Sequence, residues 1–153
     1  MKFVYDDGGR EAAGYKGKTG DCACRALAIA TGMPYKEAYD LINSYGKAER
    51  ANRKSRRGNA YNGNRSSART GVYTDTMRKI MADLGWSWVA TMHIGQGCTV
   101  HLRESELPRG RIICNLSRHF AAVIDGVLHD TYDSSRDGDR CVYGYFIKTE
   151  AAV

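Results

Sequence analysis

The chain has 153 residues and a formal net charge of +6, with 42% hydrophobic and 26% charged residues. This length and composition indicate one soluble globular domain over residues 1–153. No apolar run approaches the roughly 20 residues that a membrane-spanning helix needs, and the N-terminus lacks the apolar stretch of an export signal. We therefore expect a cytoplasmic protein with no membrane partner.

The first half of the chain predicts a short strand over residues 3–5, a glycine-rich loop and two helices. The first helix begins near Asp21, a good N-cap, and ends at Gly32. The second runs from Pro34 to Tyr45, and we expect Gly46 to end it.

The net charge is local: the segment from Lys47 to Arg69 has eight basic residues and one acidic residue, 8 − 1 = +7, so the rest of the chain sums to 6 − 7 = −1. Because this stretch is also rich in Asn, Gly and Ser, we expect a basic mobile loop at about 47–70. Its cations would suit phosphates or an acidic partner, and those we single out are Arg50, Arg53, Lys54, Arg56 and Arg57.

The second half predicts one more helix and then a sheet. Thr74 is the expected cap of a helix over 74–84, whose apolar stripe is Met77, Ile80, Met81 and Leu84. Strands are expected over residues 87–92, 99–102, 111–115, 119–124, 127–132 and 141–148. Helices followed by an antiparallel sheet make an α+β fold.

The hairpin of residues 119–132 places a histidine near an aspartate. Asp125-Gly126 is a preferred two-residue turn, which pairs residue 124 with 127 and residue 121 with 130. His119 and Asp130 then share a face as diagonal neighbours roughly 7 Å apart, within reach of a hydrogen bond. The alternative is that both are solvated surface residues.

The five cysteines are an odd number without an export signal, which argues against a disulfide framework and predicts five thiols. Cys22 is the candidate nucleophile, because the amides and dipole of a helix N-terminus lower a thiol pKa. The alternative is a small core residue, a role that Cys24 fits better. Cys22-x-Cys24 is not a usual metal spacing, so we expect neither metal nor cofactor.

A cysteine at a helix start, a histidine on a later strand and an aspartate on the next strand resemble the order of papain-like cysteine peptidases. Asp21-Cys22 followed by small residues, with His-Phe-Ala-Ala-Val at 119–123 and Asp130 downstream, looks most like the C39-type and related bacterial thiol peptidases. Residues 20–32, 122–133 and 142–146 also resemble an uncharacterised family encoded by bacteriophages and prophages.

The resemblance implies a papain-like fold with N-terminal helices packed on an antiparallel sheet. It also implies a catalytic triad of Cys22, His119 and Asp130 that acts on a protein or peptide of the bacterial host or phage, in the host cytoplasm. Papain-like enzymes usually carry a glutamine shortly before the cysteine as an oxyanion donor. Here residues 16–20 contain none, so Thr19 and Gln96 are the candidates.

Two functions follow from these observations. The first is a cysteine hydrolase, a peptidase, isopeptidase or amidase, in which Cys22 attacks a carbonyl, His119 transfers the proton and Asp130 orients His119. The alternative is a non-catalytic papain-like protein that binds nucleic acid or inhibits a host factor through the basic tract.

Overall fold

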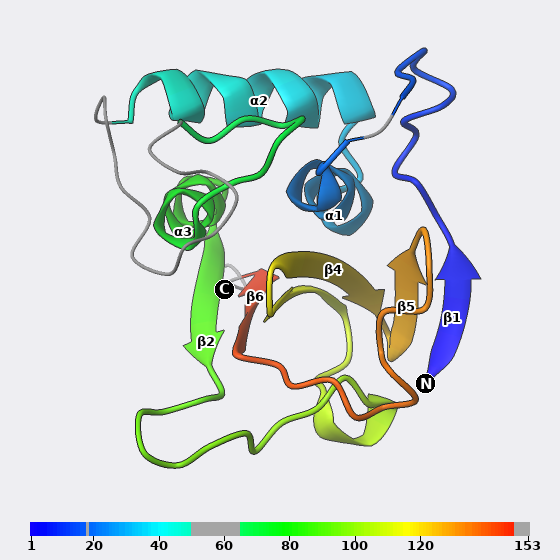
Figure 1. Cartoon of the computed structure of the whole chain (residues 1–153), viewed down its shortest axis with the longest axis vertical. Coiled ribbons are helices and arrows are strands. Elements are labelled where there is room, and N and C mark those ends of the chain that lie inside the picture. The colour runs from blue at the N-terminus through cyan, green and yellow to red at the C-terminus, as the bar shows by residue number, and fades with distance from the viewer. Residues whose placement is uncertain (18, 50–64, 149–153) are drawn as a thin grey trace, which may run out of the picture.

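The computed structural model describes residues 1–17, 19–49 and 65–148 (Figure 1). The elements follow in the order β1 (Lys2–Tyr5), α1 (Cys22–Thr31), α2 (Tyr35–Lys47), α3 (Thr74–Asp83), β2 (Trp86–Ala90), the short 3-10 helix η1 (Glu104–Glu106), β3 (Arg111–Leu116), β4 (His119–Ile124), β5 (Val127–Asp130) and β6 (Gly144–Lys148). The α+β class predicted from the sequence is confirmed.

The strands form one six-stranded sheet in the order β1-β5-β4-β3-β6-β2. Every neighbouring pair is antiparallel except β1 and β5, which run parallel. The expectation of a wholly antiparallel sheet is therefore wrong. No hairpin turn fixes the direction of β1, because the helices and three strands separate it in sequence from β5.

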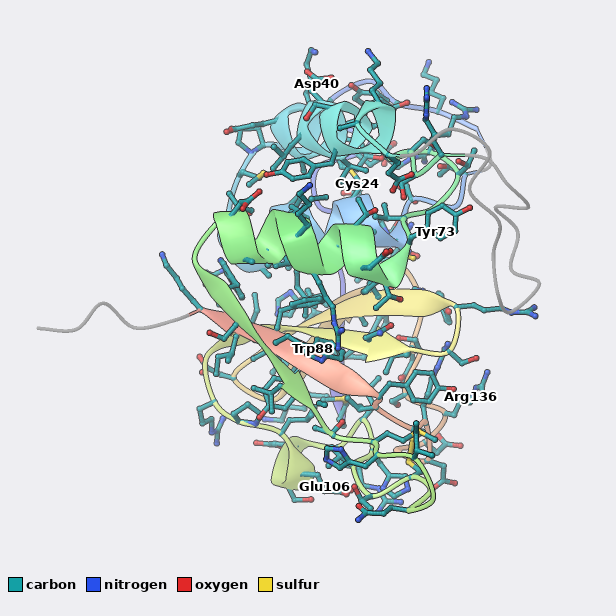
Figure 2. All side chains as sticks on the ribbon, turned by 90° about the vertical axis from the view of Figure 1, so that its left-hand side faces the viewer. Cys24, Asp40, Tyr73, Trp88, Glu106 and Arg136 are labelled. Atoms are coloured by element: carbon teal, nitrogen blue, oxygen red, sulfur yellow. A yellow bond between two sulfur atoms is a disulfide. The ribbon has the colours of Figure 1, made fainter. Side chains whose placement is uncertain are left out.

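Both faces of the central strands are buried. Ile113 and Ala122 belong to a core cluster beneath the helices, whereas Ile112 and Val123 belong to a second cluster on the opposite face. Figure 2 shows the helical layer on one side of the sheet and a layer of loops, which includes Glu106, on the other. Because β3 and β4 are covered on both faces, most of their residues are apolar, without the alternation of polar and apolar residues seen in strands with one exposed face.

The predicted helices are found, with different ends. The second helix continues through Gly46 to Lys47. Glycine is needed there for space, since a Cβ atom would collide with the carbonyl group of Ser66. Thr74 is the first residue of α3 and not its cap; Tyr73 occupies the cap position, and its side chain makes no capping hydrogen bond to the helix.

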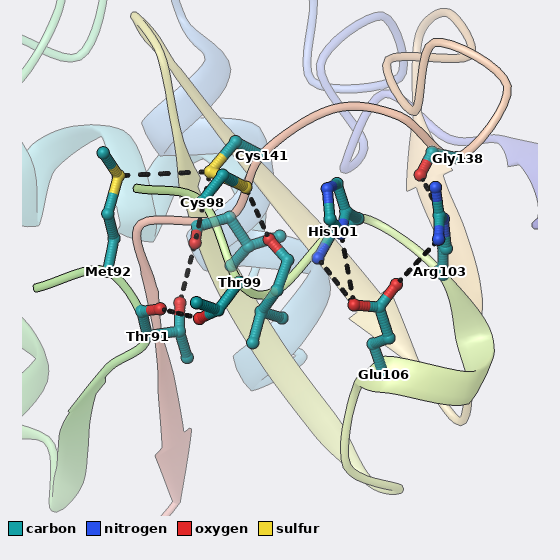
Figure 3. Close-up of a disulfide and its surroundings, with 11 residues drawn as sticks. Thr91, Met92, Cys98, Thr99, His101, Arg103, Glu106, Gly138 and Cys141 are labelled. Atoms are coloured by element: carbon teal, nitrogen blue, oxygen red, sulfur yellow. Dashed lines mark hydrogen bonds and ion pairs between the residues drawn. A yellow bond between two sulfur atoms is a disulfide. The ribbon is translucent and has the colours of Figure 1, made fainter. Parts of the chain in front are cut away.

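In the loop layer, the structure differs from the predicted strands at residues 99–102 and 141–148 and from the prediction of five free thiols. Residues 99–102 form no strand and make only a single bridge between His101 and Cys141, and β6 begins at Gly144 instead of Cys141. Cys98 and Cys141 form a disulfide with their Cα atoms 5.9 Å apart, so the five cysteines are not all thiols (Figure 3). This disulfide joins two segments that are 43 residues apart in sequence.

The expected basic loop is described only at its two ends. Lys47 closes α2, and residues 66–73 are ordered by a bridge between Ser67 and Gly71 and by the buried side chains of Ala68 and Val72. Arg50, Arg53, Lys54, Arg56 and Arg57 lie outside the described residues. Among the helices of the described ranges, none combines the length and apolar character required to cross a membrane.

Candidate active site

The three predicted site residues lie where α1 and β4 begin and β5 ends. Cys22 is the first residue of α1, His119 the first of β4 and Asp130 the last of β5. Because β4 and β5 are antiparallel, the start of one and the end of the other share one end of the sheet. The pairs Ile124 with Val127 and Val123 with Leu128 confirm the register predicted from the Asp125-Gly126 turn.

A short hydrogen bond joins the histidine to the aspartate. His119 Nε2 and Asp130 Oδ2 are 2.7 Å apart, and the two residues are only 7% and 3% exposed. Burial acts to lower the pKa of His119, but hydrogen bonds and charges from Asp130 and Cys22 outweigh it and raise the pKa to about 9. The imidazolium form is therefore favoured at neutral pH.

The Asp130 carboxylate is held by further donors. Ser134 Oγ donates to Oδ2 at 2.8 Å, and the Thr131 amide donates to Oδ1 at 2.8 Å. Burial acts to raise the pKa of Asp130, yet the hydrogen bonds from His119, Ser134 and Thr131 hold it below its ordinary value. Asp130 is thus a fixed anion that orients the imidazole and stabilises its charge.

The Cys22 thiol lies against the same imidazole. Burial acts to raise its pKa, but a hydrogen bond and charge from His119, a hydrogen bond from the Phe120 amide and the charge of Arg25 outweigh burial and lower it. Nε2 of His119 is committed to Asp130, which leaves Nδ1 for the sulfur. The arrangement favours a thiolate–imidazolium pair.

The other two free cysteines have the opposite character. Cys24 and Cys114 are both buried, and burial raises the pKa of each to about 12. The Cys24 thiol points to the carbonyl oxygen of Tyr35, 3.8 Å away. Of the three free cysteines, only Cys22 has a lowered thiol pKa.

Asp21 is the N-cap residue of α1, as predicted, but its side chain makes no capping hydrogen bond. Its carboxylate is fully buried and ion-paired with Arg25, and it accepts a hydrogen bond from Tyr35 Oη at 2.7 Å, while Arg10 Nε lies 3.5 Å away. The first N–H groups of a helix have no intrahelical partner. The Asp21 side chain does not cap these donors.

Arg25 is the functional residue that sequence reasoning missed. One Nη atom pairs with Asp21, and the other lies 3.5 Å from Asp130 Oδ1, so the guanidinium ties the start of α1 to the end of β5. The spacing of four residues between Asp21 and Arg25 in the first turn was the available signal, since such pairs meet on a helix surface.

The two predicted oxyanion donors are occupied elsewhere or exposed. The Thr19 hydroxyl donates to the carbonyl of Arg69 at 2.8 Å. Gln96 lies exposed in a turn after β2, with its backbone amide bonded to His93. The structure brings neither side chain to Cys22 among its described contacts, whereas it does bring the Phe120 amide there.

An exposed aromatic ring lies beside the His119 imidazole. The ring centroid of Tyr132 is 5.5 Å from that of His119, and Tyr132 is 51% exposed. Within the described ranges, no group of three or more His, Cys, Asp or Glu side chains is placed to hold a metal ion. The candidate site combines a polarised thiol with an accessible aromatic ring.

We compared the chain with protein-family models, with curated proteins and with solved structures, and none of the three comparisons gives a match.

Proposed function

We propose that this chain is a cysteine hydrolase with a papain-like arrangement, in which Cys22 is the nucleophile, His119 the proton carrier and Asp130 the residue that orients His119. One observation carries the proposal: Cys22, alone among the free cysteines, has a lowered thiol pKa, and the imidazole responsible is hydrogen-bonded to a buried carboxylate.

In the acylation step the Cys22 thiolate attacks the carbonyl carbon of the substrate and forms a carbon–sulfur bond. The carbonyl electrons move onto oxygen and then return as the bond to the leaving group breaks. The His119 imidazolium gives its proton to the departing amine, alcohol or thiol. The products are a thioester on Cys22, a neutral imidazole and the free leaving group.

In the deacylation step the neutral His119 removes a proton from water, and the resulting hydroxide equivalent attacks the thioester. The carbon–sulfur bond breaks, the carboxylic acid leaves, and the thiolate–imidazolium pair is restored. Asp130 keeps Nε2 of His119 engaged throughout, so that Nδ1 faces the reacting atoms in both steps.

The oxyanion needs hydrogen-bond donors that point at the position the substrate's carbonyl oxygen takes beside the Cys22 sulfur. The N-terminal amides of α1 supply them in our proposal, because the Asp21 side chain makes no capping bond. Backbone donors replace the glutamine side chain that residues 16–20 do not provide.

The substrate class follows from the surface beside the site. The exposed ring of Tyr132 beside His119 offers an apolar contact to a bound substrate. We propose a peptide, isopeptide or amide bond in a protein or peptide, consistent with the family resemblance of the sequence.

The direct test combines a thiol-directed activity probe with a chromogenic peptide ester or amide panel. Cys22 should be the residue labelled, and His119→Ala should reduce both labelling and turnover by at least about a hundredfold, the range typical of a lost general acid–base. His129→Ala is the matched control, since His129 lies on the same hairpin but bonds to Asp6 (Nδ1 to Oδ2, 3.1 Å). Equal labelling of Cys22 in both variants would contradict the proposal.

A further inference from the structure

Arg140 is a buried cation outside the triad, with 7% of its surface exposed. Its guanidinium donates to two backbone carbonyl oxygens, that of Ser117 at 2.7 Å and that of Ser134 at 3.4 Å. Burying a charged side chain is costly unless its hydrogen bonds are well made. The burial of Arg140 therefore suggests that its hydrogen bonds to the two carbonyl groups have a structural role.

Both carbonyl groups belong to segments that hold the proposed site. Ser117 lies in the tight turn between β3 and β4, two residues before His119. Ser134 donates through its hydroxyl to Asp130 Oδ2 at 2.8 Å. A single guanidinium thus connects the segment that carries the histidine to the segment that supports the aspartate.

The backbone of Arg140 is itself anchored. Its amide donates to Ser135 at 3.0 Å, and its carbonyl accepts from Leu102 at 2.8 Å. The next residue, Cys141, forms the disulfide with Cys98. Two backbone hydrogen bonds and the neighbouring disulfide therefore hold the backbone from which the guanidinium extends.

We propose that Arg140 is a positioning residue, which keeps His119 and Asp130 in hydrogen-bonding register by clamping the Ser117 turn to the Ser134 loop. The proposal rests on the function proposed above. Without the clamp, the two segments move independently, the bond between His119 and Asp130 is formed for less of the time, and the Cys22 thiolate loses support. The substrate itself is not touched, so KM should stay constant while kcat falls.

The test measures the rate of Cys22 alkylation against pH, and kcat and KM on the best ester, in the full chain. Arg140→Gln should raise the pH midpoint of alkylation by about one unit, which slows the rate about tenfold at a pH well below both midpoints. Arg140→Lys should recover part of the rate, because an ammonium reaches one carbonyl but lacks the two-pronged geometry of a guanidinium.

Arg103→Gln is the matched control. Arg103 holds the same loop through the Gly138 carbonyl at 2.6 Å and Asp139 at 3.1 Å, but contacts neither Ser117 nor Ser134 in the structure described. If Arg140→Gln is insoluble, Arg140→Lys carries the test, because it keeps the charge but loses the bond to one carbonyl, and it should shift the midpoint in the same direction by a smaller amount.

The outcomes separate the two proposals. A wild-type midpoint at the ordinary thiol value would contradict the hydrolase proposal itself. A low wild-type midpoint that is unchanged in Arg140→Gln, or one that moves equally in Arg103→Gln, would overturn only the role of Arg140.

Discussion

Replacing Asp130 with asparagine should weaken the thiolate–imidazolium pair without removing any bulk. The pKa of His119 rises from 6.5 to about 9, a difference of roughly 2.5 units or about 3 kcal/mol in favour of the imidazolium. Asp130 and Cys22 both contribute to that rise. If Asp130 supplies as little as a third of it, its loss weakens the pair by about 1 kcal/mol, or about fivefold in the equilibrium.

The assay is alkylation by iodoacetamide over a series of pH values, followed by mass spectrometry of the peptide that contains Cys22. The rate follows the thiolate fraction, so Asp130→Asn should move its pH midpoint upward and, at a pH below the wild-type midpoint, lower the rate by about fivefold. A lowered thiol pKa means that the wild-type rate reaches its plateau at a lower pH than that of an ordinary cysteine.

Asp133→Asn is the control for this experiment. Asp133 is exposed three residues further along and bonds only locally, with the amide and hydroxyl of Ser135. Its replacement should leave the alkylation rate unchanged. An Asp130→Asn protein that stays folded and reacts at the wild-type rate would refute the argument that the carboxylate supports the ion pair.

Three further predictions concern the scaffold and are checked by thermal or denaturant unfolding. Asp21→Asn should cost about 3 kcal/mol, because it leaves the buried guanidinium of Arg25 without its main counter-charge. Gly46→Ala should lower the free energy of unfolding by about 1–3 kcal/mol, because the added Cβ atom collides with the backbone of Ser66. Gly95→Ala is the control, since a Cβ atom at Gly95 meets no neighbour and the change affects only the backbone conformation. Replacing Cys98 and Cys141 by serine should lower the free energy of unfolding by up to about 4 kcal/mol, the loop-closure value for a separation of 43 residues. A loss below the measurement error in any of the three would contradict its stated cause.

The hairpin of β4 and β5 shows how much of the site could be predicted from local sequence. The Asp125-Gly126 turn fixes which residues face each other, and the period of two along a strand then places His119 near Asp130. These rules depend only on neighbours in sequence. For the same reason the apolar helix after Asp21 predicted that Cys22 would stand at a helix start.

What could not be predicted depends on segments that are distant in sequence. Asp21 satisfies every local rule for an N-cap, but besides pairing with the neighbouring Arg25 its carboxylate bonds to Tyr35 of the next helix and lies 3.5 Å from Arg10. The disulfide likewise needs Cys98 and Cys141 to meet across 43 residues, which no local pattern indicates.

In the proposed mechanism, His119 is held as an imidazolium between Cys22 and Asp130. A pH titration of the His119 ring by nitrogen-15 NMR, in the wild type and in Cys22→Ala, measures this charge state. The mechanism predicts that the wild-type ring stays doubly protonated through neutral pH and titrates near pH 9, and that the midpoint falls when the thiolate is removed. A His119 ring that titrates near 6.5 in both proteins would contradict it.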